Sequence, residues 1–190
     1  PEYWCGELGY RPGPDGIGYR DFPIHQTKVD YILSTKLRGK VVDIGCAMGY
    51  IVARLRKAGV DAWGVDVSRY ALSHAPEEVK PYLKLASADS LPFHNKEFDM
   101  AVSFSAFEHL PPAMVAKAIA EVVRVANRGV ISVTPGDDPH FDEDVTHQTK
   151  QFSRSMNSVE PAGALVDANH SSWGNHPRWF IISIKLSLSV

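Results

Sequence analysis

The residues best placed to do chemistry lie in a turn that contains two glycines and one acid. The turn reads DIGCAMG, runs from Asp43 to Gly49, and lies between a predicted strand and a predicted helix. A dinucleotide-binding fingerprint would have glycine at Ala47 and glycine or alanine at Tyr50, and a phosphate-binding P-loop would have lysine followed by serine or threonine. Both patterns fail, so the turn disfavours a nicotinamide-dependent reductase and excludes a P-loop nucleotide site.

Two further acids follow the next two predicted strands. Asp66 lies 17 residues beyond Gly49, near the spacing of roughly 20 residues at which a ribose-binding carboxylate follows such a turn. Asp89 follows the third predicted strand, where it could accept a hydrogen bond from an adenine amino group. The turn itself holds the acid Asp43 and no base, which suits a cofactor that is cationic and lacks phosphate. S-adenosylmethionine (SAM) has that character, and its carboxylate could accept from backbone N–H groups at the helix start.

Several stretches of the sequence together resemble the class I, Rossmann-like SAM-dependent methyltransferases over about residues 40–135. The matching stretches are residues 42–49, 64–68, 88–93, 98–99 and 107–110. The resemblance implies SAM as cofactor, methyl transfer as activity, and an α/β fold: a doubly wound, mostly parallel seven-stranded sheet with an antiparallel C-terminal strand. Ala47 departs from the family, which usually has glycine there, and the short region after Thr134 leaves little room for a substrate domain.

We expect the cofactor site to be formed by the glycine turn and by the ends of the second, third and fourth strands. The expected residues are Asp43, Gly45, Cys46, Ala47, Gly49, Asp66, Val67, Ala88, Asp89, Ser90, Phe104 and Ser105. Glycine at positions 45 and 49 would let the main chain approach the cofactor closely. Cys46 is expected to contribute its backbone, since no cation adjoins its thiol in sequence to lower the pKa. Taken singly, each acid could equally be an ordinary capping or loop residue.

Two histidines are candidate catalytic bases. His109 follows the fourth strand, at the sheet edge where ligands bind, and His147 lies in a long loop after the fifth. A histidine with a pKa near 6.5 can accept a proton at neutral pH, although either could serve only local hydrogen bonding. Glu108 and His109 with His140 or His147 resemble part of the metal site of some methyltransferases, but Ser105 stands where that pattern has glutamate. We therefore predict no metal site.

A parallel sheet with helices would bring these residues to one edge. Strands are predicted over residues 41–44, 60–67, 84–87, 98–104 and 129–134, and helices over residues 25–37, 49–58, 69–74 and from residue 111 onward. This alternation is typical of βαβ units. The first helix is expected to bury Val29, Ile32 and Leu33. From Ile182 to Val190 apolar and polar residues alternate, which predicts an antiparallel or edge strand with one wet face.

Length and composition predict one soluble domain over residues 1–190, with residues 40–135 as the cofactor-binding core. The chain is 44% hydrophobic and 22% charged, values typical of a globular protein. Its net charge of −2 and lack of basic runs argue against nucleic acid as a partner. Two cysteines and the absence of a long apolar run or a signal-peptide core indicate a cytoplasmic protein without membrane segments.

The glycine- and proline-rich residues 1–23 are predicted to be irregular, yet aromatic side chains recur in them. We interpret residues 1–25 as an arm or lid over the domain. The near-neutral charge favours a small-molecule or glycan acceptor methylated at oxygen or nitrogen, and oligomeric state is left open. The alternative hypothesis is a catalytically silent SAM-fold module that binds a partner protein.

Overall fold

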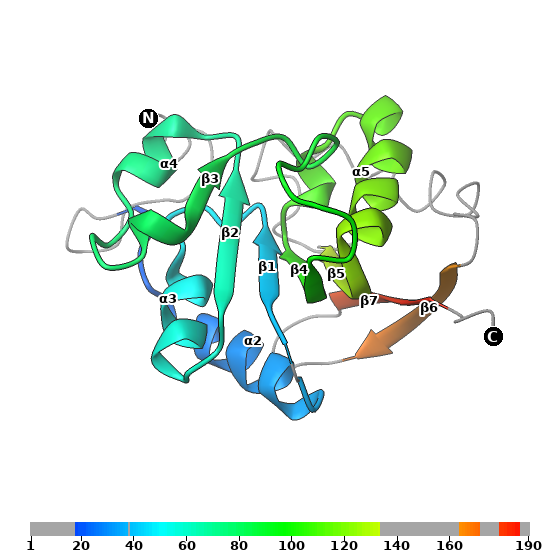
Figure 1. Cartoon of the computed structure of the whole chain (residues 1–190), viewed down its shortest axis with the longest axis horizontal. Coiled ribbons are helices and arrows are strands. Elements are labelled where there is room, and N and C mark those ends of the chain that lie inside the picture. Colours follow the sequence, from blue (N-terminus) through cyan, green and yellow to red (C-terminus); the bar gives the residue numbers. More distant parts are fainter. Residues whose placement is uncertain (1–17, 38, 134–163, 172–178, 187–190) are drawn as a thin grey trace.

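Five strands of the chain lie parallel in one sheet. They are β1 (Val41–Ile44), β2 (Ala62–Asp66), β3 (Leu83–Leu85), β4 (Phe98–Phe104) and β5 (Ala126–Val133). β1 pairs with β2 and with β4, β2 pairs with β3, and β4 pairs with β5. Figure 1 shows these strands side by side in the order β3, β2, β1, β4, β5. The predicted α/β fold with a parallel sheet is confirmed.

The computed structural model describes residues 18–37, 39–133, 164–171 and 179–186, the last two ranges as backbone only. In these two ranges the strands β6 (Ala164–Ser171) and β7 (Trp179–Leu186) run antiparallel to each other, and β7 lies antiparallel to β5. The alternating pattern predicted over residues 182–190 falls on β7 as far as residue 186, and residues 187–190 lie outside the described residues. β6 was not predicted, because its polar residues interrupt any alternation.

Helices cover both faces of the parallel strands. The α-helices are α2 (Pro23–Ser34), α3 (Tyr50–Lys57), α4 (Arg69–Ser73) and α5 (Pro112–Val125), and the short 3₁₀ turns are η1 (Lys80–Tyr82) and η2 (Phe107–His109). Because side chains alternate along a strand, Val42 packs in one buried cluster with α5, and its neighbour Val41 packs in another with α2 and α3. Within the described ranges, no helix is long and apolar enough to cross a membrane.

The face that α2 buries differs from the predicted one. Leu33 is 39% exposed and the helix ends at Ser34, whereas His25 and Lys28 are buried beside Val29 and Ile32. Spacings of three and four residues join these four side chains into one helical stripe. The prediction of Leu33 in the core is therefore wrong, and a lysine lies on the buried face instead.

The segment that joins β3 to β4 is held by Arg124 near the end of α5. The two Nη atoms of Arg124 donate to the carbonyl oxygens of Phe93 and Leu91, at 2.7 and 2.9 Å. Glu121 pairs with the same guanidinium and accepts from the Leu91 N–H at 2.6 Å. These bonds fix a connection that has no regular structure of its own, and its first residues, including Ala86 and Ala88, reach the cavity described below.

Candidate functional site

A cavity of about 370 Å³ opens where the parallel strands β1, β2 and β4 end. Its walls are formed by residues 43–47, 65–68 and 104–107, together with Tyr19, His25, Lys28, Ile51, Ala86, Ala88, His109 and Leu110. The chain leaves β1 toward β2 on one side, while β4 lies on the other, so the cavity lies at the point where the strand order reverses. Open α/β sheets bind their ligands at this point.

The glycine turn after β1 closes one wall through a tight backbone path. Gly45 has φ of +79°, and a Cβ built on it would lie 2.3 Å from the Cβ of Ala106. Ala47 also adopts a left-handed conformation, with φ of +51°, which costs about 1 kcal/mol in a residue with a side chain. Glycine at position 45 is therefore needed for two reasons: it adopts the positive φ of the turn, and it leaves room for Ala106 in the segment after β4.

Backbone N–H groups of this turn are already engaged within the protein. Gly45 and Cys46 both donate to the carbonyl oxygen of Val65, at 2.8 and 3.0 Å, and Gly49 donates to Cys46 at 2.8 Å. The Ala47 N–H donates to Asp66 at 2.8 Å. These four N–H groups are thus engaged before any ligand binds.

Asp66 at the end of β2 is a buried carboxylate that faces the cavity. It is 8% exposed, and it accepts from the N–H groups of Ala47 and Ser68 at 2.8 Å each. Burial raises the pKa of Asp66, and these backbone donors oppose the rise. A carboxylate has about four lone-pair sites, so Asp66 retains acceptor capacity for ligand hydroxyls.

Buried charges of both signs line the opposite end of the cavity. Burial raises the pKa of Asp43 to about 7, with Lys28 opposing the rise and Asp66 adding to it. Burial lowers the pKa of Lys28 to about 8, opposed by Asp43 and Glu108. The Lys28 Nζ lies 5.1 Å from the centroid of the Phe104 ring. Lys28 was not among the predicted site residues, although its place in the apolar stripe of α2 was a signal for a buried cation.

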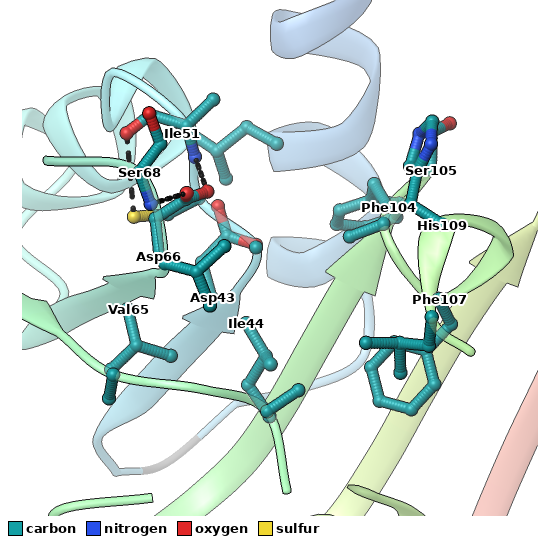
Figure 2. A pocket seen from close by; sticks show the side chains of 18 of the residues that line it. Asp43, Ile44, Ile51, Val65, Asp66, Ser68, Phe104, Ser105, Phe107 and His109 are labelled. Atoms are coloured by element: carbon teal, nitrogen blue, oxygen red, sulfur yellow. Dashed lines mark hydrogen bonds between the residues drawn. The ribbon is translucent and has the colours of Figure 1, made fainter. Parts of the chain in front are cut away.

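The predicted base His109 lines the cavity across from the acids. Figure 2 shows His109 with Ser105 on one side and Asp66 with Asp43 on the other. Ser105 has φ of +53° and donates its N–H to the Ser132 carbonyl oxygen at 2.9 Å. Non-glycine residues in this conformation concentrate at functional sites. The second predicted base, His147, lies outside the described residues.

Most of the predicted cofactor residues lie together in the cavity wall. Those that line it are Asp43, Gly45, Cys46, Ala47, Asp66, Val67, Ala88, Phe104 and Ser105. Gly49, Asp89 and Ser90 are not among the lining residues. Asp89 accepts from the Ser87 hydroxyl at 2.5 Å and pairs with Lys117 of α5 at 3.3 Å, and the Ser87 hydrogen bond is the main reason that its pKa is lowered. In the described part of the chain, no group of three or more His, Cys, Asp or Glu side chains could hold a metal ion.

Residues 41–129 match the family model of a methyltransferase domain. A ubiquinone biosynthesis O-methyltransferase of Methylococcus capsulatus is 34% identical over 128 residues, covering 61% of this chain and 52% of that protein. A protein of the same name from Ralstonia nicotianae is 33% identical over 114 residues, covering 54% of this chain and 48% of its own length. The chain thus spans about half the length of the curated relatives it matches.

Solved structures share the fold at lower identity. A TehB-like SAM-dependent methyltransferase of Corynebacterium glutamicum superposes with a TM-score of 0.63 at 19% identity, over 84% of this chain and 87% of that one. Magnesium protoporphyrin IX methyltransferase of Synechocystis, solved with bound SAM, has a TM-score of 0.59 at 15% identity, over 88% and 86% of the two chains. The similarity to both structures extends beyond residues 41–129.

Alanine substitutions at two glycines should separate backbone strain from steric clash. Gly45 and Gly59 have similar φ values of +79° and +85°, but a Cβ at Gly59 would meet nothing within 4 Å. We expect Gly59→Ala to lower the free energy of unfolding by about 1 kcal/mol and Gly45→Ala to lower it by roughly 1 to 3 kcal/mol more, as measured by urea denaturation. Adding Ala106→Gly to Gly45→Ala should recover the excess. Equal losses at the two glycines would contradict the clash.

The dependence of stability on pH should report the buried Asp43. Its folded pKa of about 7 lies above the unfolded value of about 3.9. Between these values the folded state keeps a proton that the unfolded state has released, so the free energy of unfolding falls as pH rises from about 4 to 7. Asp66 acts in the same direction, and Lys28, whose folded pKa is about 8, stays protonated over this range.

Asp43→Asn removes one of these titrations, so its free energy of unfolding should fall less steeply between pH 5 and pH 7 than that of the wild type. Urea denaturation at several pH values measures the two slopes. The exposed surface variant Asp61→Asn serves as the control and should keep the wild-type slope. Parallel curves for Asp43→Asn and the wild type would show that Asp43 is ionised throughout.

Proposed function

We propose that this chain is a class I SAM-dependent methyltransferase, which binds SAM in the cavity and transfers its methyl group to an acceptor, since residues 41–129 match the family model of a methyltransferase domain. One observation supports the proposal most directly: the matched residues surround a cavity at the point where the strand order reverses. The glycine turn, which includes Asp43, and Asp66 form part of its wall. The acceptor we infer is a small molecule or glycan, methylated at oxygen or nitrogen.

The residues of the cavity fit such a cofactor. Asp43 and Asp66 are buried in the cavity wall. Their carboxyl oxygens are suited to lie near the positive sulfonium and ammonium groups of SAM. Gly45 leaves no side chain between the turn and the cavity, and Val67, which is 68% exposed, offers an apolar surface at the β2 end where a nucleoside base could pack. When bound, SAM supplies a methyl group that its sulfonium charge has already activated.

Catalysis by this chain would consist mainly of positioning. Holding an acceptor in line with the methyl group can contribute roughly 7 to 11 kcal/mol to lowering the barrier. For a hydroxyl acceptor, His109 is placed to take the proton as the new bond to carbon forms, and Ser105 beside it is placed to orient the acceptor. The name of the relatives, O-methyltransferase, favours a hydroxyl acceptor and therefore a base.

The proposal extends to the whole chain as one methyltransferase domain over residues 1–190. In it the sheet has the seven-stranded form, with the antiparallel pair β6 and β7 beside β5. Residues 1–25 act as an arm or lid, and the described part of this arm supports the idea because Tyr19 and His25 line the cavity. A cytoplasmic location and a partner other than nucleic acid belong to the same proposal.

Binding of SAM should depend on Asp66. Isothermal titration calorimetry should detect SAM binding to the wild type, and Asp66→Ala should weaken it by about 1.5 to 3 kcal/mol, or roughly 10- to 150-fold, through loss of charged hydrogen bonds to the ribose. Asp66→Asn and the exposed variant Asp61→Asn are measured beside it, with thermal unfolding of each. Asp61→Asn should bind as the wild type does. Undiminished affinity in Asp66→Ala would remove this carboxylate from the cofactor site.

Turnover on a hydroxyl acceptor should depend on a histidine. With an acceptor found by screening phenols, alcohols and sugars for release of S-adenosylhomocysteine, His109→Ala should lower turnover by about 10²- to 10⁴-fold and leave SAM affinity nearly unchanged. The exposed His94→Ala serves as control, and His147→Ala tests the second predicted base. Wild-type turnover in both His109→Ala and His147→Ala would show that neither histidine is the base and that positioning of the acceptor accounts for catalysis. SAM binding without product on any acceptor would favour a catalytically silent module.

A further inference from the structure

The described end of the arm is fastened to the domain beside the cavity by Arg54 of α3. The guanidinium donates to the Asp21 carboxylate twice, from Nε at 3.0 Å and from Nη2 at 2.7 Å. Its Nη1 donates to the side-chain oxygen of Gln26 on α2 at 2.6 Å. Arg54 is not among the residues that line the cavity. One cation outside the cavity thus joins α3 to the arm and to α2.

His25 connects this ion pair to the cavity. Its imidazole is 3% exposed and lines the cavity, and its Nδ1 lies 3.0 Å from Oδ1 of Asp21. Its Nε2 lies 3.5 Å from the hydroxyl of Tyr19, which also lines the cavity. Both rings pack against Tyr50, with centroids 5.8 Å away in each case. Contacts therefore run without a break from Arg54 through Asp21 and His25 to the cavity wall.

The imidazole of His25 is neutral at pH 7. Burial has the largest effect on its pKa and lowers it. Asp21 of the arm opposes this effect, whereas the positive charges of Lys28 on the same helix and of Arg54 on α3 add to it. A neutral imidazole carries one proton, so one ring nitrogen donates and the other accepts.

The ionised carboxylate of Asp21 places this proton on Nδ1. Burial alone would raise the pKa of Asp21, but hydrogen bonds from Arg54 and His25 outweigh it and lower that pKa, so the carboxylate can only accept. The Phe22 N–H also approaches Nδ1, at 3.2 Å. A hydrogen bond to an ionised group is roughly twice as strong as a neutral one, so Nδ1 donates to Asp21. Nε2 is left with a lone pair that can accept from the Tyr19 hydroxyl.

We propose that Arg54 is a positioning residue of the cavity, and that it acts through Asp21 and His25 to hold Tyr19 in the wall beside the bound ligand. The inference rests on the proposed function, since the ligand is the cofactor or its product, and deepens it by giving a task to a residue outside the cavity. The Asp21 side chain is 40% exposed. Without the guanidinium, water would compete with His25 for this carboxylate, and Tyr19 would be held less firmly.

Binding of S-adenosylhomocysteine tests the inference without an acceptor. By isothermal titration calorimetry, Arg54→Ala and Asp21→Ala should each weaken binding by roughly 2- to 5-fold, as expected for an ion pair that is partly exposed to water. The double variant should lose no more than the weaker of the two, because both changes break one chain of contacts. Arg54→Lys should recover part of the loss.

The tautomer of His25 is a second readout, which a loss of stability alone would not change. Long-range ¹H–¹⁵N correlation spectra of labelled protein distinguish a proton on Nδ1 from one on Nε2. We expect Nδ1–H in the wild type. In Asp21→Ala the proton should move to Nε2, because Nδ1 is then left to accept from the Phe22 N–H, and Arg54→Ala should shift the population in the same direction.

The exposed Lys57 on α3 provides a matched control. Lys57→Ala should bind S-adenosylhomocysteine as the wild type does and keep its Nδ1–H tautomer, and circular dichroism establishes that each variant is folded. Undiminished affinity in folded Arg54→Ala, an equal loss in Lys57→Ala, or additive losses in the double variant would overturn the inference. So would Nε2–H at His25 in the wild type.

The wild type separates this inference from the proposed function. If the wild type binds S-adenosylhomocysteine and any of these contrary results is found, the role of Arg54 is overturned and the proposed function stands. If neither SAM nor S-adenosylhomocysteine binds to the wild type, the proposed function is overturned and this inference with it.

Discussion

One carboxylate holds together the two turns on which the cavity depends. Asp66 accepts from the N–H of Ala47 in the turn after β1 and from the N–H of Ser68 at the start of α4. Without it, the buried N–H of Ala47 and the partly buried N–H of Ser68 would lose their acceptor, and the loss at the buried group costs about 1 to 3 kcal/mol. The Ser68 hydroxyl then accepts from Ala71 and begins α4. The positions of the glycine turn and of the β2 end are therefore coupled through a single side chain that also faces the ligand space.

The two ends of this cavity differ in the charged side chains of their walls. Toward the β2 and β3 ends the wall is apolar apart from Asp66 and Ser68, with Val67, Ala86 and Ala88 exposed to the space. Toward α2 the wall holds Asp43 and Lys28, both buried. The sheet and the segments that follow β2 and β3 form the first end. The second end also requires α2, which precedes the βαβ units.

Features that depend on local interactions could be predicted from the sequence, and features that depend on contacts across the fold could not. β1 and β4 were predicted at their observed bounds, because each is a mostly apolar run bounded by turn residues, and the bounds of the other predicted elements up to β5 differ by at most three residues from the observed ones. The wall residues on the glycine turn and on the β2 and β4 ends followed from the parallel-sheet rule. Lys28 and the ion pair of Asp89 did not, because each depends on a contact across the fold: the packing of α2 against the sheet for the first, and Lys117 of α5 for the second.

Gly64 in the middle of β2 has a consequence for how this site can change. A Cβ at Gly64 would lie 2.7 Å from the Cys46 Sγ and 2.8 Å from Leu83, so the thiol after β1 occupies the volume that a side chain on β2 would need. The sizes of residues 46 and 64 are thus coupled, although 18 positions separate them in the chain. A larger residue at 64 therefore needs a smaller one at 46, whereas residue 46 cannot grow toward β2, because the glycine opposite it is already the smallest residue.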